Sequence, residues 1–126
     1  MDQEHGSIIV ILGTNLPMAP HQLRRLAKRA AIGIGRGGTP GGNNSGDIFL
    51  AFSTANRGPL HQVAGPRLSI DMINDELLDP VYMAATESIE EAVINALLAA
   101  ESMSTLKPPG FICGAIDPDQ LSKYFT

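Results

Sequence analysis

The expected fold is decided by the stretch SIIVILG at residues 7–13, a continuous aliphatic run that ends at a glycine. Such a run predicts a strand that is buried on both faces of a sheet. The stretch IFLAFST at residues 48–54 predicts a second strand. Between them, residues 20–34 carry apolar side chains at helical spacing, and Pro20 suits the first position of a helix. The order indicates the α/β class, with a sheet that is incomplete in this chain.

The rest of the chain predicts a loop and two further helices. Residues 33–46 are rich in glycine, which is costly in regular structure, so a loop is expected there. A long helix is expected over residues 73–100, with Pro80 at its start or at a kink. Asp117 is expected to cap a short final helix that ends near Tyr124.

The composition indicates one globular domain over residues 1–126 and argues against two classes of partner, nucleic acid and membrane. Hydrophobic residues make up 44% of the chain, and 9 basic against 13 acidic residues give a net charge of −4. This balance provides no large basic surface, so nucleic acid is not an expected partner. The apolar run at residues 8–12 is too short for a signal peptide or a membrane span, so no membrane partner is expected.

The single cysteine gives an expectation about the cellular compartment. Cys113 cannot form an internal disulfide, and its apolar neighbours predict a buried structural residue. A reducing, cytoplasmic location is therefore expected. An export signal on a missing amino-terminal portion would change this expectation.

Two short motifs match known sites but lack the context that those sites require. GIGRGG at residues 33–38 has the dinucleotide-binding pattern G-x-G-x-x-G, which needs a strand before it and a helix after it. Here the expected helix precedes the motif and a loop follows, so nucleotide binding is not expected. Residues 43–45, Asn-Asn-Ser, match a glycosylation sequon, which we interpret as accidental because no secretory signal accompanies it.

The dipeptide Gly6-Ser7 suggests a nucleophile if the bond between the two residues is cut. Ser7 would then carry a hydroxyl and a free α-amine, whose reference pKa is about 8. A neutral amine can activate a weak hydroxyl nucleophile. The alternative, a serine that opens a strand without any chemical role, stays open at this point.

The tripeptide Ser45-Gly46-Asp47 adds a hydroxyl and a carboxylate before the second strand. In an extended chain, residues two apart point to the same face and lie about 6.6 Å apart, so both groups would face one site. Asp47 can orient Ser45 or hold the protonated amine of Ser7, and Gly46 allows another backbone to approach closely. The alternative is ordinary turn chemistry at the end of a loop.

Three longer stretches carry a more specific pattern: GSIIV at residues 6–10, PHQLRRLA at residues 20–27 and GGNNSGDIFLAFSTAN at residues 41–56. Together they resemble the DmpA-type family, the L-aminopeptidase/D-Ala-esterase/amidases and β-peptidyl aminopeptidases. The resemblance runs from Gly6 to about Glu101 and is most specific at residues 41–56.

This resemblance implies a precursor that cleaves itself at a Gly-Ser bond into a longer α and a shorter β chain. The implied fold is a four-layer αββα sandwich like that of N-terminal nucleophile hydrolases, assembled into homo-oligomers. Matched by position, the scissile bond is Gly6-Ser7 and the nucleophile is Ser7, with Ser45 and Asp47 as supporting groups. Asp47 stands where some relatives carry Glu, so its side chain is one methylene shorter.

The implied activity is that of a serine aminopeptidase or amidase that needs no metal or other cofactor. Ser7 would form an acyl-enzyme with peptides, amides or esters that have a free amino terminus, and water would release the amino acid. Only residues 1–6 precede Ser7, so the α portion is expected to be missing, as in a fragment, a split gene or one subunit. Loss of one oxyanion donor typically costs about 2.7 to 4 kcal/mol, so the isolated chain is expected to be nearly inactive.

Three alternatives remain beside this hypothesis. The first is a catalytic triad of serine with His21 or His61. His21 is expected to face solvent from the first turn of a helix. His61 and Asn44 can line a pocket. A second function is that of a non-catalytic structural or assembly subunit with the same fold. Acyl transfer is the third, and Ser7 argues against it because the self-cleaving acetyltransferases of similar fold use Thr.

Overall fold

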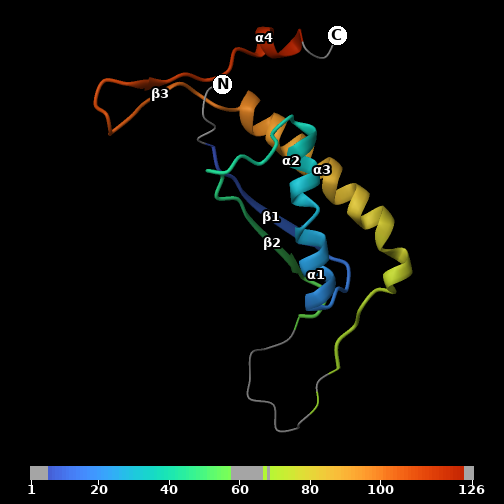
Figure 1. Cartoon of the computed structure of the whole chain (residues 1–126). Coiled ribbons are helices and arrows are strands. Elements are labelled where there is room, and N and C mark those ends of the chain that lie inside the picture. The colour runs from blue at the N-terminus through green and yellow to red at the C-terminus, as the bar shows by residue number, and fades with distance from the viewer. Residues whose placement is uncertain (1–5, 58–66, 68, 124–126) are drawn as a thin grey trace. The chain divides into compact units, whose positions relative to one another are not determined.

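The computed structural model describes residues 6–57, 67 and 69–123, which fall into two compact units, Met1–Glu90 and Glu91–Thr126. The first unit is built on a parallel pair of strands, β1 (Ile9–Thr14) and β2 (Ile48–Ser53). Between them the chain forms α1 (Pro20–Ala27) and α2 (Ala30–Arg36), as Figure 1 shows. The long helix α3 (Leu78–Leu98) begins after a short 3₁₀ turn, η1 (Asp75–Leu77). The predicted α/β order of strand, helix and strand is confirmed.

The two strands expose one face and bury the other. The register pairs Ile9 with Ile48 and continues to Thr14 with Ser53, so alternate residues of both strands share a face. One face packs on α1, α2 and α3 through Val10 and its neighbours. The opposite face is exposed and carries Ile9, Ile11, Ile48, Leu50 and Phe52, of which Ile9 is 69% exposed. The prediction of burial on both faces is wrong for the described chain, because its helices cover only one face.

The helical region after β1 is longer than predicted and is divided in two. α1 starts at Pro20, as expected, and a turn at Lys28 and Arg29 separates it from α2. α2 continues through Gly33 and Gly35, where a loop was predicted. A Cβ at Gly33 would lie 2.8 Å from both the Ile89 Cβ and the Thr86 carbonyl oxygen. Close packing of α2 on α3 therefore requires glycine here, and this contact outweighs the low helix propensity of the residue.

The helix that was predicted over residues 73–100 begins later, since Asn74 starts the short turn η1 instead. The Asn74 side chain accepts a hydrogen bond from the Glu76 amide (3.1 Å). Pro80 lies in the first turn of α3, where its missing N–H leaves no bond unmade, and its predicted place at the start of this helix is confirmed. Tyr82 and Ile89 of α3 are buried against the rest of the first unit.

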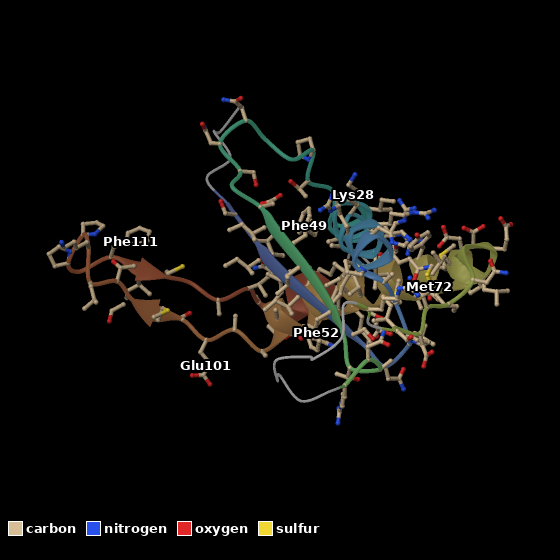
Figure 2. The ribbon with its side chains drawn as sticks, turned by 90° about the horizontal axis from the view of Figure 1, so that it is seen from below. Lys28, Phe49, Phe52, Met72, Glu101 and Phe111 are labelled. Carbon is tan, nitrogen blue, oxygen red and sulfur yellow. The ribbon has the colours of Figure 1, made fainter. Side chains whose placement is uncertain are left out.

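The second unit contains a hairpin and a short helix. β3 (Met103–Ser104) and β4 (Ile112–Cys113) pair antiparallel, and Figure 2 shows Phe111 on this hairpin. α4 (Pro118–Ser122) is capped by the Asp117 side chain, which accepts from the Asp119 amide (2.9 Å), as predicted. The predicted burial of Cys113 is wrong, because no layer of described residues from its own unit covers the hairpin.

Candidate functional site

The candidate site lies at the amino ends of β1 and β2. Because the strands run parallel, the residues that precede them come side by side: in the extended register, Asp47 lies opposite Ile8 and Gly46 opposite Ser7. The pairing reaches this point through the Ile48 amide, which donates to the Ile8 carbonyl (3.0 Å). Two segments that are about 40 positions apart in the sequence thus meet at one end of the sheet.

Two hydrogen bonds join the segments beyond the regular strand pairing. The Gly46 amide donates to the Ser7 Oγ (3.0 Å), and the Ile8 amide donates to the Asp47 Oδ1 (3.2 Å). The Ser7 hydroxyl and the peptide group that follows it are therefore both held by one short stretch of chain, Gly46 and Asp47. A Cβ at position 46 would lie 3.5 Å from the Ser7 Oγ, which is ordinary van der Waals contact.

The Ser45 and Asp47 side chains meet, as their spacing predicts. The Ser45 Oγ donates to the Asp47 Oδ1 at 2.6 Å, a length typical of a hydroxyl bonded to a carboxylate. The same oxygen accepts from the Ile8 amide, so one carboxylate atom links the loop to the residue that precedes β1. Ser7 and Asp47 are exposed and Ser45 is half-buried, which leaves the cluster open to solvent in the described chain.

The remaining predicted site residues are not brought into this cluster by a hydrogen bond that the structure records. Gly6 is exposed beside Ser7, and Asn44 is exposed in the turn before Ser45. His21 is exposed in the first turn of α1, which follows the carboxyl end of β1. Six strand residues span about 20 Å, so a triad of Ser7 with His21 is not supported. His61 lies outside the described residues.

The structure adds two groups that side-chain patterns did not identify, the amides of Ile8 and Gly46. Backbone donors carry no residue-type signal, and only the strand register reveals them. Within the described ranges, no group of three or more His, Cys, Asp or Glu residues is arranged to hold a metal ion. Nor does any helix in that part of the chain have the length and apolarity to cross a membrane.

The sequence matches the model of one peptidase family, S58, over residues 1–108. It is similar to the β-peptidyl aminopeptidase BapA of Sphingosinicella microcystinivorans, with 50% identity over 99 residues, 79% of this chain and 25% of the relative. It is also similar to BapA of Sphingosinicella xenopeptidilytica, with 40% identity over 105 residues, 81% of this chain and 25% of the relative. The chain therefore spans about a quarter of the length of these curated relatives.

A solved structure gives the same assignment. The L-aminopeptidase D-Ala-esterase/amidase of Ochrobactrum anthropi, described as a prototype of the serine aminopeptidases and a variant of the Ntn hydrolase fold, superposes with a TM-score of 0.83. Its sequence is 56% identical, and the match covers 94% of this chain and 34% of that one. The described chain thus has part of an Ntn-hydrolase fold.

Proposed function

Because the chain belongs to peptidase family S58, an aminopeptidase family, we propose that it carries the nucleophile of a self-processing serine aminopeptidase or amidase, and that this nucleophile is Ser7. The observation that supports this most directly is the hydrogen bond from the Gly46 amide to the Ser7 Oγ (3.0 Å). It holds the hydroxyl beside the bonded Ser45–Asp47 pair (2.6 Å). One exposed end of the sheet thus carries the Ser7 hydroxyl, the Asp47 carboxylate and the Gly6-Ser7 peptide bond, whose cleavage would release an amine.

The first proposed step is self-cleavage between Gly6 and Ser7. The Ser7 Oγ attacks the Gly6 carbonyl carbon, the C–N bond between the residues breaks, and the hydroxyl proton passes to the nitrogen. Gly6 is then an ester on Oγ, and water hydrolyses it to a Gly6 carboxylate and the free hydroxyl. The released α-amine of Ser7 can act as a base, which an amide nitrogen cannot.

In turnover, the neutral α-amine of Ser7 accepts the hydroxyl proton as Oγ attacks the carbonyl carbon of the substrate's amino-terminal residue. The bond to the leaving group breaks, the leaving group takes up the proton, and an ester on Oγ remains. Water, deprotonated by the same amine, hydrolyses the ester and releases the amino acid. Asp47 positions Ser45 and the backbone after Ser7, since its Oδ1 accepts from the Ser45 Oγ and the Ile8 amide.

The proposed partner is an α portion like the one that family relatives carry. Its docking would cover the exposed apolar sheet face of Ile9, Ile11, Ile48, Leu50 and Phe52. It would also supply the oxyanion donors and the contacts to the substrate amine. The names of the relatives point to peptides, amides or esters with a free amino terminus as substrates. A homo-oligomer in the cytoplasm, bound to neither nucleic acid nor membrane, is the proposed setting.

The decisive experiment combines the chain with an α portion from a close relative and measures hydrolysis of an amino acid p-nitroanilide. We expect release of p-nitroaniline, and a loss of at least about 10³-fold in Ser7→Ala. Ser88→Ala is the matched control: its hydroxyl donates to the Ala84 carbonyl (2.7 Å) on the exposed side of α3, and its activity should stay within about twofold. Undiminished activity in Ser7→Ala would rule out this nucleophile.

Intact-mass spectrometry separates this proposal from the second candidate, a non-catalytic assembly subunit. That candidate is favoured by one observation, that the Ser7 nitrogen is an amide in the chain as it stands. A species that begins at Ser7 supports the processed enzyme. A chain that keeps residues 1–6 within an otherwise complete assembly supports the idle subunit.

A further inference from the structure

We propose that the backbone amide of Gly46 is a positioning donor for the Ser7 nucleophile, in addition to the side chains of Ser45 and Asp47. This inference rests on the proposed function of Ser7. The amide donates to one lone pair of the Ser7 Oγ at 3.0 Å, so the hydroxyl proton is not directed at the Gly46 nitrogen. That proton therefore stays available to a base.

The donor is held in place before any reaction begins. Gly46 lies between Ser45 and Asp47, whose side chains bond each other at 2.6 Å. The Asp47 carboxylate in turn accepts the Ile8 amide, and the Ile48 amide donates to the Ile8 carbonyl. The Gly46 N–H therefore needs no rearrangement to reach Oγ, which is the condition under which a hydrogen-bond donor contributes most to a reaction.

The charge that develops on Oγ gives this donor its effect. A hydrogen bond to an ionised acceptor is about twice as strong as one between neutral groups. The oxygen becomes more negative while its proton leaves, so the Gly46 bond strengthens at the step that makes Ser7 nucleophilic. The amide should therefore raise kcat more than it lowers KM.

A side-chain substitution at position 46 does not test this donor. A Cβ there would lie 3.5 Å from the Ser7 Oγ, an ordinary van der Waals distance, so a methyl group would fit. Every residue type except proline would also keep the N–H. The test must therefore replace the N–H itself.

Replacement of Gly46 by glycolic acid isolates it, because an ester oxygen takes the place of the N–H and no side chain is added. In the active enzyme with its α portion present, we expect kcat to fall about tenfold or more while KM stays within about twofold. A loss in KM alone, or an unchanged kcat, would overturn the proposal. If the unmodified enzyme needs no Ser7 hydroxyl, the proposed function fails instead, and Ser7→Ala reports that outcome separately.

Gly41 provides the matched control in the same loop. Its amide also donates to a hydroxyl oxygen, Thr39 Oγ1, at 3.2 Å, and it lies outside the strand pairing that brings Gly46 to Ser7. The same ester replacement at Gly41 should leave kcat within about twofold. An equal loss of kcat in both esters would assign the effect to general loosening of the loop and overturn the proposal.

Hydrogen exchange gives a second readout that does not depend on folding of the Gly46 ester. Exchange of the Gly46 amide should become at least about tenfold faster in Ser7→Ala, which removes its acceptor, whereas the Gly41 amide should not change. An unchanged exchange rate at Gly46 would show that the bond makes no contribution in solution and would overturn the proposal.

Discussion

The two ends of the β1/β2 pair both carry hydroxyl side chains, and the comparison shows what distinguishes a structural hydroxyl from a candidate nucleophile. At the carboxyl end, the Ser53 Oγ donates to the Leu16 carbonyl (2.5 Å) and accepts from the Ala55 amide (3.1 Å). The proton and a lone pair of this half-buried hydroxyl are both engaged by backbone. Such a hydroxyl connects the loops to the sheet, and its proton is already donated to a carbonyl, so it is not available for transfer.

At the amino end, the exposed Ser7 Oγ also accepts from a backbone amide, that of Gly46. Unlike Ser53, it has no recorded acceptor for its proton among the described residues. The neighbouring Ser45 donates to a carboxylate instead of a carbonyl. The position of a serine at the end of a strand is therefore not informative by itself, whereas the engagement of its hydroxyl proton by backbone is.

Among the tests of this comparison, the largest effect is expected from a change in Asp47, the carboxylate at the amino end of the strand pair. Asp47→Asn should lower kcat roughly 10²-fold. The neutral asparagine side chain would hold the Ser45 hydroxyl and the Ile8 backbone amide less firmly than the carboxylate does. The measurement is p-nitroanilide hydrolysis by the chain combined with the proposed α portion. Ser53→Ala, a change at the carboxyl end, should keep its activity and lower the free energy of unfolding by about 1 kcal/mol. If Ser53→Ala lost as much activity as Asp47→Asn, the two ends would not differ as proposed.

A smaller effect, on stability alone, is expected at the polar network near the carboxyl end. Gln22 is fully buried; its side chain accepts from the Ala19 amide (3.0 Å) and donates to the Ile73 carbonyl (2.8 Å). Gln22→Ala leaves these groups unpaired and should lower the free energy of unfolding by about 2–3 kcal/mol, measured by urea denaturation. Arg24→Ala, at an exposed position of the same helix, should change it by less than about 0.5 kcal/mol. Equal losses in the two variants would contradict the structural role of this network.

The smallest effect concerns Asp75, the carboxylate of the same network. A hydrogen bond from Gln22 (2.6 Å) lowers the pKa of Asp75 below its usual 3.8; partial desolvation opposes this, and the Arg25 charge adds to it. A lowered folded-state pKa stabilises the protein above pH 3.8, and this contribution disappears as the pH falls through the folded-state value. Asp75→Asn should therefore be less stable than wild type at pH 7, and the difference should become smaller as the pH is lowered from 7 to 2. A difference that stays constant between these two pH values would contradict this assignment.

The fold was predictable from the sequence where local patterns act alone. The runs at residues 7–13 and 48–54 predicted both strands of the parallel pair, and Pro20 and Asp117 marked two helix starts. Gly33 was misassigned because its helical state depends on contact with Ile89, a residue more than 50 positions away. The hairpin strands β3 and β4, of two residues each, are too short to produce a pattern.

The candidate site could be predicted as a set of side chains but not as a geometry. The spacing of Ser45 and Asp47 predicted their contact, which depends on local extended backbone. Their approach to Ser7 depends on strand register, which a single sequence does not specify. The roles of the Ile8 and Gly46 amides follow only from that register, since every residue type except proline carries the same donor.

The open face of the β1/β2 pair also has a consequence for the cell that makes this chain. The described sheet has two strands, so each is an edge strand with unpaired backbone groups, and its uncovered face is rich in isoleucine, leucine and phenylalanine. Uncovered edges of this kind recruit further strands and lead to aggregation. If the proposed α portion covers this face, we expect the chain to aggregate less in its presence than when it is made alone.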